Sequence, residues 1–239
     1  VIVTAQKKSE NLQNVPISVS TLSATELDNL NIKDFADYVL QLPSASATQR
    51  RPGQGQIFMR GISDGGNSNQ SLQGPAVAIY LDESPVTMIG DNLDVHVYDI
   101  ERVEALSGPQ GTLYGAASQA GNLKIITNKP SSEFDSGVNV SVESTSGGDD
   151  STMVEGFVNI PLSENIAMRF VGFNDDDGGY IDSVSDSITF PLSGITRTNE
   201  MFVEDNFNDA VKEGYRAALR VDLNDSWKID ANFMGQETE

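Results

Sequence analysis

The sequence predicts an α+β domain followed by antiparallel β-strands that have one apolar and one polar face. Three observations lead to this prediction. The first is a helix start signal, Ser23-Ala24-Thr25-Glu26, ahead of a second helical pattern. The second is a glycine-rich crossing between two strand candidates in residues 99–130. The third is a regular alternation of apolar and polar residues after Pro130, as in strands with one apolar face.

The N-terminal part contains short strand and helix candidates. Val1-Ile2-Val3-Thr4-Ala5 is a β-prone run that by itself indicates a frayed terminus or an edge strand. Val15–Ser20 forms a second strand candidate, and Ser23 and Glu26 fit a helix capping box. A second helix ends before Pro43. Its expected core-facing residues are Ile32, Phe35, Ala36, Val39 and Leu40.

Arg60 stands inside an otherwise apolar strand candidate, residues 57–62. A guanidinium group is always charged, so burying it requires a carboxylate or several acceptors. Residues 63–75 follow as a polar loop without periodicity. His96 is the single histidine of the chain. We expect it to have a partly buried structural role, because no motif for a catalytic nucleophile accompanies it.

The central stretch, Asp99 to Pro130, reads DIERVEALSGPQGTLYGAASQAGNLKIITNKP. Glycine permits positive φ angles and close backbone approach, so the segment is expected to fold sharply between its two strands. A phosphate-binding loop would need Gly-Lys-Ser/Thr, which is absent here. The full string resembles the plug domain of TonB-dependent outer-membrane receptors. The motif residues that carry this resemblance are Gly108, Pro109, Gly111, Tyr114 and Gly115.

The resemblance implies a plug domain over residues 11–130, preceded by an N-terminal segment, residues 1–10. Within that segment, Ile2, Val3, Thr4 and Ala5 look like the TonB box, which pairs as an added strand with a TonB-like periplasmic energy-coupling protein. In this family, plug arginines pair with barrel glutamates to latch the plug, and Arg60 matches one such position. The family usually carries a second arginine before Gly-Pro, where this chain has Ser107.

Residues 131–239 are expected to be the first strands of an outer-membrane β-barrel. On one of these strands Leu219 should face lipid and Arg220 the lumen. Short turns contrast with a long acidic connection, Asp175 to Glu213, and outer-membrane barrels show this asymmetry. The few strands present cannot close a barrel, since plugged outer-membrane transporters have about 22 strands. We therefore expect an incomplete part of a large plugged β-barrel, the N-terminal part of a longer receptor.

The composition narrows the classes of partner and chemistry. The chain has 15 basic and 35 acidic residues and a formal charge of −20, so nucleic acid is not an expected partner. The absence of cysteine excludes disulfides and thiolate metal sites. No catalytic residues and no cofactor are expected, and metal binding is left open.

The resemblance implies a non-enzymatic receptor in the bacterial outer membrane, with its plug reaching the periplasm. It would contact membrane lipid and import a scarce, bulky extracellular nutrient: a siderophore, cobalamin, haem or a glycan. A passive porin-like barrel is an alternative that the plug sequence disfavours. A second alternative is a secreted β-rich carbohydrate- or calcium-binding module, with Asp175-Asp176-Asp177 as oxygen ligands but without EF-hand spacing.

Overall fold

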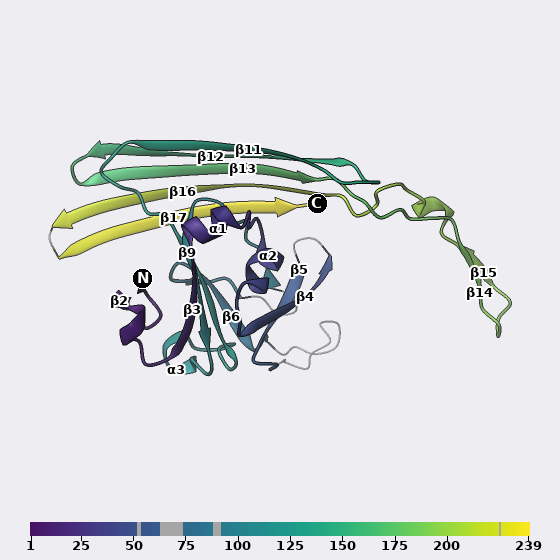
Figure 1. Cartoon of the computed structure of the whole chain (residues 1–239), viewed down its shortest axis with the longest axis horizontal. Coiled ribbons are helices and arrows are strands. Elements are labelled where there is room, and N and C mark those ends of the chain that lie inside the picture. Colours follow the sequence, from purple (N-terminus) through teal and green to yellow (C-terminus); the bar gives the residue numbers. More distant parts are fainter. Residues whose placement is uncertain (52–53, 63–73, 88–91, 225) are drawn as a thin grey trace. The chain divides into compact units, whose positions relative to one another are not determined.

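The computed structural model describes residues 1–51, 54–62, 74–87, 92–224 and 226–239. Most of the predicted polar loop, residues 63–75, lies outside the described residues. The chain divides into two compact units, Val1–Asn128 and Lys129–Glu239, each with its own sheets (Figure 1).

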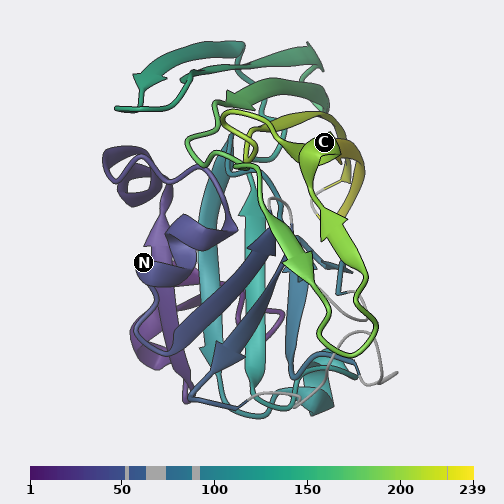
Figure 2. The ribbon, with the colours of Figure 1, turned by 90° about the vertical axis from the view of Figure 1, so that its right-hand side faces the viewer.

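A five-stranded sheet forms the centre of the N-terminal unit (Figure 2). In spatial order its strands are β3 (Ser18–Ser23), β9 (Ile100–Ser107), β10 (Gly121–Thr127), β6 (Val77–Leu81) and β7 (Ser84–Pro85). Strand β10 runs antiparallel to β9 and parallel to β6. Every residue of β10 is buried, so both faces of this strand are covered. The two strands that flank the glycine-rich stretch are thus neighbours in the sheet.

Two smaller sheets and short helices complete the described part of this unit. The small sheets are β1 (Ile2–Val3) with β2 (Glu10–Asn11), and β4 (Ala45–Arg51) with β5 (Gln54–Met59) and β8 (Asn92–Leu93). The helices are α1 (Ala24–Asn29), α2 (Phe35–Leu40), α3 (Gly111–Tyr114) and the 3₁₀ turn η1 (Leu12–Asn14).

Local hydrogen bonds explain where the helices begin. The capping box predicted for α1 is confirmed: the Glu26 N–H donates to the Ser23 hydroxyl at 3.4 Å, and the Ser23 N–H donates to the Glu26 carboxylate at 2.8 Å. Asp34 caps α2 with its carboxylate. The expectation that Leu40 faces the core is wrong, because its side chain is 82% exposed. The helix ends there, and the following Leu42 fills the core instead.

Long antiparallel strands, paired in chain order, form the sheet of the C-terminal unit (Figure 1). They are β11 (Asp135–Ser144), β12 (Asp150–Ser163), β13 (Ile166–Asp177), β16 (Ala210–Asn224) and β17 (Trp227–Thr238). The connection between β13 and β16 is shorter than predicted, because both strands extend into it. It carries an unanticipated hairpin and a 3₁₀ turn: β14 (Ser187–Thr189), β15 (Thr196–Thr198) and η2 (Glu200–Phe202).

The two faces of this sheet differ as the alternation predicts. On β16, the side chain of Tyr215 is 53% exposed, whereas that of Arg216 is 7% exposed. Large exposed apolar residues on the same face as Tyr215 are Val138, Val140, Val142, Val154, Phe170, Leu223, Ile229 and Phe233. Buried polar residues on the opposite face are Glu155, Asn159, Arg169, Asp175, Lys212 and Arg216. This arrangement matches a barrel wall with a lipid-facing and a lumen-facing side.

Asp175, Asp176 and Asp177 do not form the calcium site of the alternative interpretation. They are consecutive residues of β13, and successive side chains of a strand point to opposite faces. Asp175 is accordingly buried and Asp176 exposed. In the part of the chain that the structure describes, no group of three or more histidine, cysteine or acidic side chains could hold a metal ion. Among the described helices, none is long and apolar enough to cross a membrane.

Candidate functional site

Residues 2–5 of the N-terminal segment, which we call the docked segment, pack against the rest of the N-terminal unit. Ile2 and Val3 form β1 and pair antiparallel with Asn11 and Glu10 of β2. Val3 and Ala5 are fully buried, whereas the side chain of Ile2 is 59% exposed. The segment is therefore a held strand and not a frayed terminus.

Apolar contacts cover one side of the docked segment. Val3 and Ala5 belong to a buried cluster that also draws on the central sheet and on α3. The other members of this cluster are Val15, Ala78, Tyr80, Leu106 and Tyr114. Burying apolar surface stabilises by about 25 cal/mol per Å², so these contacts favour the docked position.

Charged side chains hold the backbone of the segment at Thr4. The Thr4 N–H donates to the Glu104 carboxylate at 2.8 Å. The Lys124 ammonium donates to the Thr4 carbonyl and to its hydroxyl, each at 3.2 Å. Glu104 and Lys124 lie opposite each other on β9 and β10, so their side chains share one face of the sheet. Both side chains have an exposed fraction of 0%.

Each of these buried charges has a further partner outside the segment. The Arg102 Nε donates to the Glu104 carboxylate at 2.8 Å, and the Lys124 ammonium lies 3.1 Å from the Glu83 carboxylate. Buried charges are costly unless they are paired and hydrogen-bonded. The set of Arg102, Glu104, Lys124 and Glu83, which we call the charged clamp, therefore depends on these mutual pairs as well as on Thr4.

Tyr114 closes the site from the side of α3. Its hydroxyl donates to the Ala5 carbonyl at 2.7 Å, and its own carbonyl accepts a bond from the Tyr80 hydroxyl at 2.7 Å. The two rings meet edge to face with centroids 5.1 Å apart. Burial, and then the nearby Glu83 and Glu104 carboxylates, raise the pKa of Tyr114 above its ordinary value. The hydroxyl therefore stays protonated at neutral pH and remains a donor.

The glycine motif explains how Tyr114 reaches this position. Gly108 and Gly115 have φ angles of 101° and 73°, which glycine adopts without steric cost. The Gly108 N–H donates to the Ala120 carbonyl at 2.8 Å, and the chain then turns through Pro109 into α3, which begins at Gly111. The motif thus returns the chain from β9 to β10 and presents Tyr114 to the segment.

Arg60 lies elsewhere and differs from its predicted setting. Strand β5 ends at Met59, and Arg60 follows in a turn with a φ angle of 53° and an exposed side chain. The expectation of an arginine inside an apolar strand is therefore wrong, because the chain turns one residue earlier. A guanidinium nitrogen of Arg60 lies 3.6 Å from the position that a Cβ on Gly108 would take. A latch role for Arg60 stays a prediction.

Ser107 and His96 are both buried. The Ser107 hydroxyl donates to the hydroxyl of Ser44 at 2.6 Å, so a neutral pair occupies the position before Gly108. His96 lies between β8 and β9 and is 3% exposed, which fits the structural role expected for it.

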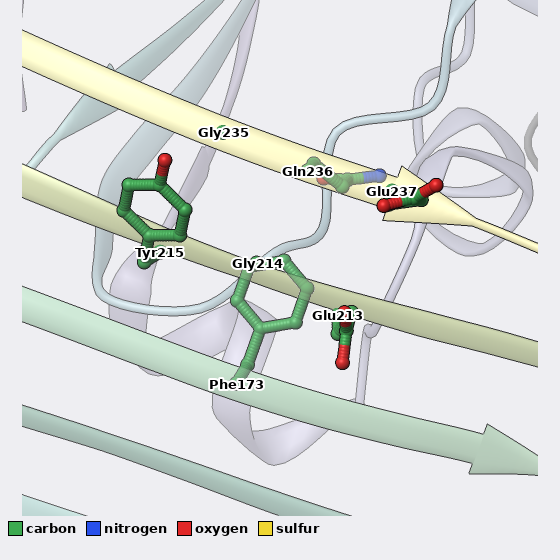
Figure 3. A pocket seen from close by; sticks show the side chains of 7 residues that line it. All are labelled: Phe173, Glu213, Gly214, Tyr215, Gly235, Gln236 and Glu237. Atoms are coloured by element: carbon green, nitrogen blue, oxygen red, sulfur yellow. The ribbon is translucent and has the colours of Figure 1, made fainter.

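The C-terminal unit has a pocket of about 460 Å³ near the last residues of β13 and β17 and the first residues of β16 (Figure 3). The Phe173 ring lies against Gly214, and the Tyr215 ring against Gly235, so aromatic side chains fill the space that the glycines leave. Glu213 and Glu237 of the lining lie directly opposite each other on β16 and β17. Because the lining comes from both faces of the sheet, the pocket is not an enclosed ligand site.

Sequence reasoning singled out residues 2–5 and Tyr114, whose functional roles stay predictions, and it missed the charged clamp. A signal was present, because Arg102, Glu104 and Lys124 interrupt strands that are otherwise apolar. A charge in such a strand requires a buried partner or an exposed strand end. The sequence alone did not show that the partner is the backbone of Thr4.

Comparisons with known proteins agree with this architecture. The family model of the TonB-dependent receptor plug domain matches residues 11–122. The pesticin receptor of Yersinia pestis is 32% identical over 133 residues, which are 55% of this chain and 19% of that protein. The vitamin B12 transporter BtuB of Vibrio vulnificus is 31% identical over 147 residues, 59% of this chain and 22% of that protein.

A solved structure extends the likeness beyond the plug. The pyoverdine outer membrane receptor FpvA of Pseudomonas aeruginosa PAO1 matches 99% of this chain and 30% of its own, with a TM-score of 0.73 and 19% identity. At that identity the likeness concerns the fold. This chain spans about a fifth of the length of the curated relatives named above. Residues 11–122 therefore belong to the plug domain family of TonB-dependent receptors, and the fold of the chain as a whole matches such a plug domain followed by the first strands of an outer-membrane receptor barrel.

Proposed function

We propose that this chain is part of a receptor that binds a scarce, bulky nutrient outside the cell and imports it through an energised movement of the plug. The observation that carries the proposal is the docked N-terminal segment. It is a short extended strand at the start of the plug, held by strand pairing with β2 and by hydrogen bonds to β9 and β10. A pull on such a strand would be transmitted to β9 and β10 of the central sheet.

A siderophore or cobalamin is the nutrient class that the relatives favour. One relative is named a vitamin B12 transporter, and the solved neighbour is a pyoverdine receptor. Haem and glycans complete the wider set that the family resemblance implies. The proposed import changes no bond of the nutrient, so the protein acts as a transporter and not as an enzyme.

The proposed energy source is a TonB-like periplasmic protein that adds a strand to the segment. In such pairing the backbone supplies much of the affinity, and side chains contribute specificity. The Thr4 N–H and the Val1 carbonyl are occupied in the docked state, by Glu104 and by the Leu12 N–H. The segment must therefore leave its site before those groups can pair with a partner.

The connection between β13 and β16, residues 178–209, is proposed to lie outside the cell and to contribute to nutrient contact. It contains six acidic residues and one basic residue. It also exposes many large apolar side chains: Tyr180, Ile181, Val184, Ile188, Phe190, Leu192, Ile195, Met201, Phe202, Val203 and Phe207. Exposed apolar groups of this density are typical of contact surfaces.

A transport assay with the full-length receptor tests the proposal. A deletion strain complemented with the parental receptor is first grown on candidate ferric siderophores, cobalamin, haem and glycans to find the nutrient. Val3→Pro is then introduced, because proline lacks the N–H and fixes φ and so disrupts strand pairing. We expect nutrient binding to whole cells to persist and uptake to stop.

Val3→Ala is the matched control for the proline variant. It keeps the backbone donor and removes only part of a buried side chain, so uptake should stay close to the parental rate. If the proline variant transports as fast as the parent, the segment does not couple energy to transport. If no candidate nutrient depends on the receptor, the proposed nutrient class is wrong.

A further inference from the structure

All polar atoms of Thr4 are held in the docked segment. Its N–H and hydroxyl contact the Glu104 carboxylate at 2.8 and 3.3 Å. Its hydroxyl also lies 3.3 Å from a guanidinium nitrogen of Arg102 and 3.2 Å from the Lys124 ammonium. Its carbonyl accepts from Lys124 and from the Lys7 N–H, at 3.2 and 2.9 Å. Among the described residues, no other residue of the segment makes as many polar contacts.

The residues of the charged clamp keep ion-pair partners whether the segment is docked or released. When Thr4 leaves, Glu104 loses a backbone donor but keeps the Arg102 guanidinium, and Lys124 loses a carbonyl but keeps the Glu83 carboxylate. The Glu83 side chain is 62% exposed, so solvent already reaches one end of the clamp. Release therefore leaves paired charges that water can solvate, and not isolated buried ions. The clamp is compatible with a docked and a released segment.

Asn122 destabilises the docked position of the segment, whereas Glu104 and Lys124 stabilise it. It is fully buried on β10, paired in register with Ala78 and Leu106, which both belong to the cluster that contacts Val3 and Ala5. Neither polar atom of its side chain has a hydrogen-bond partner among the described residues. A buried amide without a partner costs free energy that hydration would return. Opening the segment above this face would relieve that cost.

We propose that the polar groups beneath the segment set how readily it is released: Glu104 and Lys124 hold Thr4, and Asn122 limits the strength of that hold. This regulation rests on the proposed function of the segment, but it can be measured without nutrient, partner or energy. Glu104, Lys124 and Asn122 act here as positioning residues, since they contact the segment or the face beneath it and not the nutrient.

The experiment measures how fast a buried thiol at position 3 becomes accessible. The chain has no cysteine, so Val3→Cys supplies a unique thiol within it, and in the full-length receptor any other cysteine is replaced. Isolated outer membranes are treated with a maleimide, and the modification rate reports the released fraction. The second substitutions, made in this background, are Lys124→Met, Glu104→Gln, Thr4→Val and Asn122→Leu. Lys8→Met is the control, because Lys8 is exposed and away from the contacts to Thr4 described here.

We expect Lys124→Met to raise the modification rate about tenfold or more, since it removes a charge-assisted hydrogen bond to Thr4. Glu104→Gln should raise it less, since the amide oxygen still accepts from the Thr4 N–H but without the charge. Thr4→Val should raise it several-fold, Asn122→Leu should lower it, and Lys8→Met should leave it unchanged. A cysteine at Val39, which is buried in α2, checks that the plug stays folded.

Thr4→Val keeps the proposal testable if a clamp substitution unfolds the plug, because it changes only the segment. If Lys124→Met, Glu104→Gln and Thr4→Val all leave the modification rate at the parental value, these residues do not hold the segment. If Asn122→Leu raises the modification rate, Asn122 does not weaken the docked position. The transport assay could show that the segment has no role in import, while the modification rates still change as expected. The two proposals are therefore tested separately.

Discussion

Leu219 and Arg220 provide a sharp test of which face of the C-terminal sheet meets lipid. They are neighbours on β16, so their side chains point to opposite faces. Leu219 lies opposite Met168 and Ala231 on the apolar face, whereas Arg220 pairs with Asp230 through two contacts of 2.7 and 3.1 Å. We predict that Leu219→Arg destabilises the receptor more than Arg220→Leu does.

The position of Leu219 along the strand determines how much stability Leu219→Arg should cost. Strand β16 spans Ala210–Asn224, and Leu219 is two residues from its central residue, Ala217. With a rise of about 3.3 Å per residue and a tilt of about 45°, Leu219 lies roughly 5 Å from mid-height. An arginine near the bilayer midplane costs about 2–4 kcal/mol.

Arg220→Leu should cost less. The Arg220 and Asp230 side chains are 25% and 39% exposed, so solvent screens their attraction. Partly exposed ion pairs contribute about 1 kcal/mol or less. Urea unfolding of the full-length receptor in lipid vesicles, followed by heat-modifiable gel mobility, compares the two variants. Equal losses of stability for both substitutions, or a larger loss for Arg220→Leu, would refute the assignment of faces.

Three further predictions concern the plug. Gly121→Ala should destabilise the plug by about 1–3 kcal/mol in chemical unfolding, because the new Cβ would lie 2.3 Å from a carbonyl oxygen of β9. Gly111→Ala is the control and should be neutral, because its Cβ would meet no atom within 4 Å. Arg60→Ala should increase antibiotic leakage through the full-length receptor if Arg60 latches the plug, and unchanged leakage and plug stability would remove that role. Hydrogen bonds from Ser23 lower the pKa of Glu26 below 4.5, so this carboxylate stabilises the fold above pH 4.5 and the contribution is lost as pH falls through the lowered pKa. Ser23→Ala should cost about 1 kcal/mol at neutral pH and reduce the acid dependence measured by chemical unfolding, and an unchanged pH profile would contradict this origin.

The features that the sequence predicted correctly depend on neighbours in the chain. The capping box at Ser23 and Glu26 involves residues three positions apart. The alternation on β16, such as Tyr215 beside Arg216, follows from the two-residue repeat of any strand. The motif at Gly108 and Gly115 needs positive φ angles, which glycine supplies locally.

The features that the sequence did not predict depend on contacts between distant segments. Glu104 and Lys124 are buried because residues 2–5, about a hundred positions earlier, cover them. Arg60 lies one residue beyond the end of β5, and strand ends are the least certain part of such predictions. The hairpin of β14 and β15 is a few residues long within a polar connection, too short for a periodic signal.

The most direct test of energised import compares binding and accumulation of the nutrient with and without the proton-motive force of the inner membrane. Cells that express the full-length receptor are incubated with labelled nutrient, and surface-bound label is separated from internal label. The proposed function predicts that a protonophore leaves surface binding unchanged and abolishes accumulation, and that Val3→Pro does the same in energised cells. Accumulation that continues at the parental rate under both conditions would contradict it.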